Sequence, residues 1–223
     1  MNLGMYTYGF NNPLRYTDPD GKQSIDEALF KLRHWNAANA IGTFQKGSDN
    51  ITTVATRFAY TGAAPQSSNM ILSGEVVNQR TGEANAMRHV VWQAIIAGEF
   101  GGDIAEQAGT AHEGRAGRQT DMNRTVFSSY SAADTAVDLR NNAIGRQVGE
   151  ANQGKSRLDI AKETLEKFHR EGFWTAEKTK SGFELKLQPL SDEKYKAYKD
   201  ALQRQDDNGR WIKQDAGSKT DSK

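Results

Sequence analysis

The 223-residue sequence has no cysteine, only 4 prolines, no long apolar run and no excess of one charge. The lack of cysteine excludes disulfide bonds, thiol catalysis and thiolate zinc sites. With 29 basic and 28 acidic residues, the net charge of +1 creates no global field for nucleic acid or an anionic membrane. No run approaches the roughly 20 apolar residues of a membrane-spanning helix, so we expect no stable membrane insertion. No signal peptide opens the sequence, so we expect export only as part of a larger protein.

Apolar residues recur at helical spacing along most of the chain. The first such stretch follows Ser24 and carries Ile25, Leu29, Leu32 and Trp35 on one stripe. The predicted elements are helices over 25–46, 51–60, 84–98, 102–113, 131–151, 156–171 and 191–206, and a β-hairpin over 173–190. The sequence therefore predicts a mainly α fold, a compact multi-helix domain with a small β-hairpin near the C-terminus.

Three segments are predicted to lack regular structure. The stretch 114–123 contains arginine and glycine and is predicted to be a loop, after which Ser131 would cap the next helix. A second loop is predicted over 62–69, where Gly, Pro, Ser and Asn gather. The last residues, 216–223, are small or polar and are predicted to form a disordered tail. We therefore assign 22–215 to one helical domain.

The first 21 residues are rich in aromatic residues, asparagine and glycine. They carry, in this order, Asn2-Leu3, Tyr6-Thr7-Tyr8, Asn11-Asn12-Pro13 and Asp18-Pro19-Asp20-Gly21. This order resembles the stretch that closes the core of bacterial Rhs/YD-repeat polymorphic toxins. The resemblance implies that residues 1–21 end a β-cocoon that encapsulates the domain behind it. Because Lys22 follows Gly21 where self-cleaving families have an apolar residue, we do not expect cleavage at this junction.

Residue types suited to chemistry gather in three clusters. On a helix, Asp138 and Asn142 are four residues apart and share a face, and His89 shares a face with Trp92. Such side chains are costly to bury without partners, so they indicate either a polar network or a functional site. The clusters are Asn85-Ala86-Met87-Arg88-His89-Val90-Val91-Trp92, Thr110-Ala111-His112-Glu113 and Asp138-Leu139-Arg140-Asn141-Asn142-Ala143-Ile144-Gly145-Arg146.

Together the clusters resemble an uncharacterised helical domain found at the C-termini of bacterial polymorphic and secreted proteins. That domain has an Arg-His-x-x-Trp helix, a His-Glu helix end and an Asp-Leu-x-Asn-Asn-x-x-Gly-Arg helix, matched here within about 80–150. The resemblance implies site residues without a reaction. The remaining histidines, His34 and His169, are predicted to be surface residues. The predicted catalytic residues are His89, His112, Glu113 and Asp138, and the predicted substrate-binding residues are Arg88, Trp92, Arg140, Asn141, Asn142 and Arg146.

Two chemistries suit these residues. A divalent metal ion could be held by His89, His112 and Asp138, an order loosely similar to that of helical metal-dependent phosphohydrolases. Without a metal, His112 or Glu113 would act as general base and His89 as general acid, because imidazole titrates near neutral pH. The arginines of the clusters suit an anionic group such as a phosphate.

The sequence thus predicts an antibacterial toxin domain that hydrolyses a phosphoester-type substrate in a target bacterial cell. It would be secreted or delivered as part of a larger toxin, with the Rhs core as its carrier. The toxin resemblance also implies a cognate immunity protein in the producing cell. Two alternatives stay open: a toxin that attacks the envelope or membrane without nuclease activity, and a non-enzymatic adaptor domain.

Overall fold

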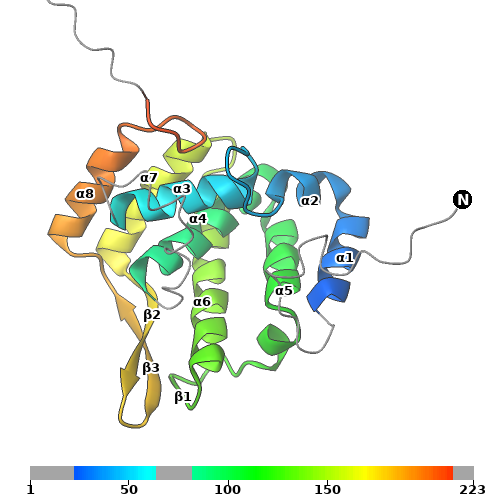
Figure 1. Cartoon of the computed structure of the whole chain (residues 1–223), viewed down its shortest axis with the longest axis vertical. Coiled ribbons are helices and arrows are strands. Elements are labelled where there is room, and N and C mark those ends of the chain that lie inside the picture. The colour runs from blue at the N-terminus through cyan, green and yellow to red at the C-terminus, as the bar shows by residue number, and fades with distance from the viewer. Residues whose placement is uncertain (1–22, 64–81, 213–223) are drawn as a thin grey trace, which may run out of the picture.

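The computed structural model describes residues 23–63 and 82–212, which form helices and a small sheet (Figure 1). This confirms the predicted mainly α fold with a hairpin near the C-terminus. No helix in these two ranges is long and apolar enough to span a membrane. The Rhs-like segment 1–21, the tail 216–223 and most of the predicted loop 62–69 lie outside the described residues. The elements are α1 (Gln23–Arg33), α2 (Trp35–Ile41), α3 (Ile51–Ala63), α4 (Glu83–Phe100), α5 (Gly102–Gln119), β1 (Val126–Phe127), α6 (Tyr130–Ala151), α7 (Arg157–Glu171), β2 (Phe173–Thr179), β3 (Gly182–Gln188) and α8 (Asp192–Leu202).

Helix α4 is the central element of the fold and is buried on nearly every face. Between residues 84 and 97 every side chain but that of Arg88 is buried. The helix contacts α3, α5, α6 and α7, which pack around it (Figure 1). Because burial of apolar surface is the main stabilising term in folding, α4 is the centre of the core. Four apolar residues that recur at helical spacing along it are all fully buried: Met87, Val91, Ala94 and Ile95.

Helix α6 lies directly against α4, and two glycines allow the close approach. A Cβ atom on Gly145 would lie 2.4 Å from the carbonyl oxygen of Val90, and one on Gly149 would lie 2.2 Å from that of Ala94. Both pairs advance in the same direction along the two helices, so α4 and α6 run parallel. Only glycine lets the backbones come this near, and the same approach brings the polar residues of the two helices into contact.

The sheet has three antiparallel strands in the order β1-β3-β2. The predicted hairpin over 173–190 is confirmed by β2 and β3, with Trp174 opposite Leu187. Strand β1 was not predicted, because its two residues are too few to show an alternating pattern. The sheet packs on α6 and encloses a second, smaller apolar cluster beside the main core. That cluster consists of Phe127, Ala133, Ala136, Val137 and Leu185.

The predicted single helix over 25–46 is wrong. The chain breaks at His34, whose φ of −129° and ψ of 52° are not helical, and α2 ends at Ile41 before Gly42. The predicted stripe does not face the core throughout: the side chains of Leu32 and Trp35 are 80% and 60% exposed. A helical stripe keeps one direction only while the helix is continuous.

The predicted loop over 114–123 is also too long. Gly114 has a φ of 54° and a ψ of −138°, so the helical run does break immediately after Glu113. A positive φ of this kind is readily adopted only by glycine. The helix then resumes and continues to Gln119, so that the loop begins at Thr120.

Two other helix ends differ from their predicted positions. Helix α6 is capped by Ser129, whose side-chain oxygen accepts from the N–H of Ala132, and not by Ser131. Helix α8 ends at Leu202 and not at residue 206. Each difference is within a few residues, as expected where several serines or polar residues compete for one helix end.

Candidate functional site

Polar residues of α4 meet polar residues of α6 at two levels, one helical turn apart. At the first level, Asn85 Nδ2 donates a hydrogen bond of 2.9 Å to Asp138 Oδ1. At the second, His89 Nδ1 lies 3.1 Å from Asn142 Oδ1. All four side chains are buried, so each of these two contacts replaces water that the bonded atoms would otherwise bind. The four-residue spacing on both helices aligns the two levels.

The guanidinium of Arg88 determines the protonation of His89. Its Nη2 donates to Asn85 Oδ1 over 2.7 Å and lies 2.9 Å from His89 Nε2. Because a guanidinium has no acceptor, His89 Nε2 must accept, and the ring proton is on Nδ1, which donates to Asn142. Desolvation, followed by the charge of Arg88, lowers the pKa of His89 well below its usual value. His89 is therefore a neutral imidazole.

Two buried carboxyl groups lie beside this imidazole. Asp138 Oδ1 is 3.3 Å from His89 Nε2, and Glu113 of α5 joins them so that one ligand atom of each lies within 4.8 Å of the others. Desolvation, followed by the charge of Asp134, raises the pKa of Glu113 to about 8. Desolvation, followed by the charges of Glu113 and Asp134, also raises the pKa of Asp138. At neutral pH Glu113 therefore holds its proton. We call Asn85, Arg88, His89, Glu113, Asp138 and Asn142 the His89 network.

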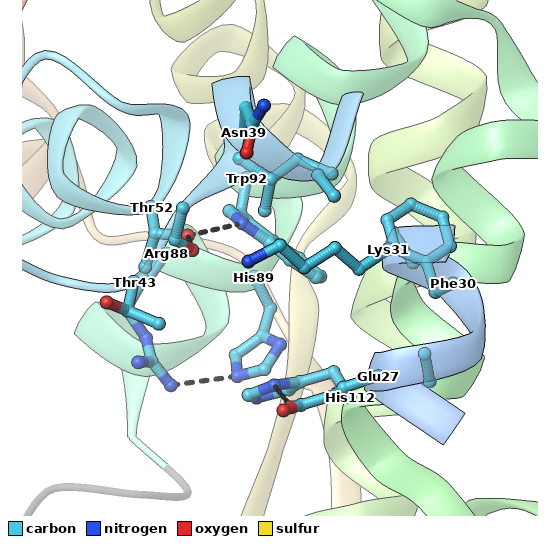
Figure 2. A pocket seen from close by; sticks show the side chains of 15 residues that line it. Glu27, Phe30, Lys31, Asn39, Thr43, Thr52, Arg88, His89, Trp92 and His112 are labelled. Atoms are coloured by element: carbon cyan, nitrogen blue, oxygen red, sulfur yellow. Dashed lines mark hydrogen bonds and ion pairs between the residues drawn. The ribbon is translucent and has the colours of Figure 1, made fainter. Parts of the chain in front are cut away.

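A pocket of about 350 Å³ opens onto this network from the side of α1 and α2 (Figure 2). Arg88 and His89 form part of its α4 wall, and His112 faces it from α5 with 46% of its side chain exposed. Desolvation, followed by the charge of Arg88, lowers the pKa of His112 to about 4. His112 is thus a neutral base that a ligand can reach. The pocket is lined by Glu27, Phe30, Lys31, Ala38, Asn39, Ile41, Gly42, Thr43, Thr52, Arg88, His89, Trp92, Ala108, Ala111 and His112.

The groups that a metal ion would need are only partly in place. His89, Glu113 and Asp138 offer ligand atoms close enough to share one ion, whereas His112, which we expected among the ligands, is not in this group. Arg88 Nη2 already uses the lone pair of His89 Nε2, and its positive charge opposes a second cation. As these side chains lie, they do not fit a metal ion, and no step proposed below uses one.

Most of the predicted site residues come together. Trp92 lines the pocket, donates from its indole N–H to Thr52 Oγ1 over 3.1 Å, and lies with its ring 5.6 Å from that of His112. Of the predicted residues, the pocket or the His89 network includes His89, His112, Glu113, Asp138, Arg88, Trp92 and Asn142.

Three of the predicted substrate-binding residues lie elsewhere and hold the fold together. Asn141 accepts from the backbone N–H of Trp174 and donates to its carbonyl, which fixes β2 to α6. Arg140 stacks over the Trp174 ring at 4.2 Å and donates to the carbonyls of the 122–124 loop. Arg146 lies 3.9 Å from Glu106. Successive helical residues differ in direction by about 100°, so neighbours of Asp138 and Asn142 do not share their face.

Two polar residues of α4, Asn85 and Gln93, were not predicted as catalytic or substrate-binding residues although their spacing relates them to His89. Asn85 is one turn before His89 on α4 and bonds both Asp138 and Arg88. Gln93 is one turn after His89, is fully buried, and lies against Gly109 of α5, where a Cβ atom would come within 2.6 Å of its Nε2. A run of polar residues at positions i, i+4 and i+8 on an otherwise apolar helix was the available signal.

The other two histidines lie at the surface, as predicted, but each has a partner. His34 Nε2 lies 2.9 Å from Gln107 Oε1, which joins α1 and α2 to α5. His169 Nε2 lies 2.8 Å from Asp192 Oδ1, and its ring stacks on Tyr195 at 4.1 Å. Neither histidine lies in the pocket or in the His89 network.

The raised pKa of Glu113 predicts how stability depends on pH. The folded state keeps this proton up to about pH 8, whereas the unfolded chain loses it near 4.5, so Glu113 makes the free energy of unfolding fall as the pH rises between these values. Glu113→Gln removes this loss, so its free energy of unfolding relative to that of the unaltered chain is expected to be about 3 kcal/mol higher at pH 7.5 than at pH 5. Urea unfolding at both pH values measures the difference.

The matched control is Glu106→Gln on the same helix, whose side chain is 64% exposed. It should shift the unfolding curves at pH 5 and pH 7.5 by the same small amount. Equal curves for Glu113→Gln and Glu106→Gln at pH 7.5 would show that Glu113 is ionised at ordinary cost in the folded protein.

Residues 48–172, more than half of the chain, match a family described as a domain of unknown function, DUF6973. Comparisons with curated proteins and with solved structures give no match. The matched region begins just before α3 and ends just after α7, so it contains every residue of the His89 network but neither α1 nor α2. The chain therefore belongs to the DUF6973 family, and the His89 network lies within the family's domain.

Proposed function

We propose that the chain carries the toxin domain of an Rhs-type polymorphic toxin and that this domain hydrolyses a phosphoester-type substrate. The toxin part of the proposal is supported by the resemblance of residues 1–21 to the end of an Rhs core. It implies delivery into a target bacterial cell with the core as carrier, and a cognate immunity protein in the producing cell. The hydrolytic part is supported by the His89 network.

One observation carries the hydrolytic proposal: neutral imidazoles at the wall of a pocket lie in front of buried carboxyl groups whose pKa values are raised. The pKa values of His89 and His112 are lowered, while those of Glu113 and Asp138 are raised. Environments that push the pKa values of neighbouring groups apart supply a base and an acid at the same pH. Arg88 adds a cation that suits the oxygens of a phosphate.

A hydrolytic cycle can be written with these groups alone. His112, open to the pocket, takes a proton from a water molecule that attacks phosphorus. Once Arg88 has turned from His89 to the phosphate, the freed lone pair of His89 Nε2 can share the proton of Asp138 Oδ1, which lies 3.3 Å away. The bond from phosphorus to the leaving oxygen breaks, and this oxygen takes that proton. The proton on His112 then returns to the Asp138 and His89 pair through the water of the emptied pocket. Arg88 turns from His89 to the phosphate and balances its charge as the new bond forms.

Expression of the full chain in a bacterial host tests the proposal. The chain is produced in the cytoplasm and, separately, behind an export signal, and growth, nucleotide pools and lipid-linked phosphates are followed. We expect growth arrest in one compartment, loss of a phosphate-containing substrate there, and no rescue of that substrate by EDTA in lysates. His112→Gln, at a pocket-facing position, should lower the rate by about 10²- to 10⁴-fold because it removes the general base.

The other outcomes separate the alternatives. Equal killing by the chain and by His112→Gln, with leakage of the cell envelope, would replace hydrolysis by membrane attack. Harmless expression in both compartments would favour an adaptor domain.

A further inference from the structure

Helices α1 and α2 form the outer wall of the pocket, opposite the His89 network. Phe30 and Lys31 of α1 and Ile41 of α2 line the pocket, and Figure 2 shows Lys31 extending into it. This wall precedes residue 48 and is therefore not part of the region matched to the family. None of the residues of this wall was predicted from the sequence to be a catalytic or substrate-binding residue. The wall and the network together decide what the pocket can hold.

The charges that line the pocket favour an anion. Two cations, Lys31 and Arg88, face it together with one carboxylate, Glu27. The carboxylate of Glu27 is next to His112, with 3.9 Å between Glu27 Oε1 and His112 Nδ1. The lowered pKa values leave both pocket histidines without charge, and the pKa values of the two carboxyl groups behind them are raised, which opposes negative charge there. A phosphate placed between Lys31 and Arg88 would meet two charged donors.

The rest of the pocket surface is largely apolar. Phe30 and Ile41 come from the outer wall, Trp92 from α4, and Ala108 and Ala111 from α5. A free phosphate ion would leave this surface in contact with water. A ligand whose phosphate carries an apolar or aromatic group would cover it, and each covered methylene contributes about 0.8 kcal/mol to binding. A volume of about 350 Å³ is in the range of small-molecule sites.

We infer that the pocket binds a small organic phosphate, with the phosphate between Lys31 and Arg88 and an apolar or aromatic body against the wall of α1 and α2. This inference rests on the proposed function, because it names the substrate class of the same site. Lys31 and Phe30 are then specificity residues. The same ligand chemistry occurs in nucleotides, whose body is a base, and in prenyl phosphates, whose body is a hydrocarbon chain.

Calorimetric titration of the full chain with three probes tests the inference: inorganic phosphate, AMP and farnesyl phosphate. At least one organic phosphate is expected to bind about tenfold or more tightly than inorganic phosphate. Lys31→Met is expected to weaken that binding by about tenfold, since it removes one of two charged donors while keeping the length of the side chain. The matched control Lys162→Met, at an exposed lysine of α7, should bind like the unaltered chain.

The outcomes are distinct. Preference for AMP identifies a nucleotide and preference for farnesyl phosphate a lipid-linked phosphate, and either supports the inference. Equal binding of all three probes, binding of none, or unchanged binding by a folded Lys31→Met overturns it. Binding is also measured with His112→Gln. If organic phosphates bind as expected but the chain hydrolyses nothing, the proposed function fails and the inference stands. If the chain hydrolyses a phosphoester but binds none of the organic phosphates as expected, the inference fails and the proposed function stands.

Discussion

Replacing His89 by glutamine is expected to lower the hydrolytic rate by about 10³-fold while the protein stays folded. In the proposed cycle, His89 Nε2 shares the Asp138 proton meant for the leaving oxygen once Arg88 has turned to the phosphate, and glutamine cannot share it because an amide does not titrate. The side chain also bonds Asn142 and accepts from Arg88, so the loss removes the group that links the two levels of the network. Initial rates on the probe that binds best measure the effect.

The folded state of this variant needs its own measurement, because His89 is buried. Urea unfolding and circular dichroism should show a cooperative transition, with a decrease in stability of about 1 to 3 kcal/mol for polar groups left without partners. His169→Gln is the matched control, since that histidine pairs with Asp192 at the surface. A folded His89→Gln protein with an unchanged rate would remove His89 from the mechanism.

The His89 network was largely predictable from the sequence, because it depends on spacing within single helices. Asp138 and Asn142 are four residues apart, and Arg88 and His89 lie on a helix that is mainly apolar. A polar residue on the buried face of a helix must find a partner, and few helices were available to supply one. The sequence did not show that Asn141, next to Asn142, would instead hold a strand, because that depends on where β2 packs.

The outer wall of the pocket was not predictable in the same way. Its residues lie on α1 and α2, and the predicted apolar stripe of this region is partly exposed, with Leu32 80% accessible. The break at His34 reorients the chain, and no strong local signal such as proline marks it in the sequence. Lys31 among other charged residues has the pattern of a solvated helix face, and only the fold turns it toward Arg88.

Replacing Gly149 by valine is expected to lower the free energy of unfolding by about 3 kcal/mol. A Cβ atom there would lie 2.2 Å from the carbonyl oxygen of Ala94 and 2.7 Å from the Cβ of Ala97. Neither atom can rotate away as the end of a long side chain could, so α4 and α6 would have to separate. Valine has a higher helix propensity than glycine, but by less than 1 kcal/mol, so the steric term decides the sign.

Urea unfolding with Gln147→Val as control measures this effect, since Gln147 is exposed on the same helix and valine there meets no packed neighbour. The control should change the free energy of unfolding by less than about 0.5 kcal/mol. Gly149 is seven residues beyond Asn142, about 10 Å along the helix, so separation of the helices should also lengthen the contact of Asn142 with His89 and lower the hydrolytic rate. An unchanged urea midpoint for Gly149→Val would mean that α4 and α6 are not in contact at this level, and the alignment of the His89 network would then need another cause.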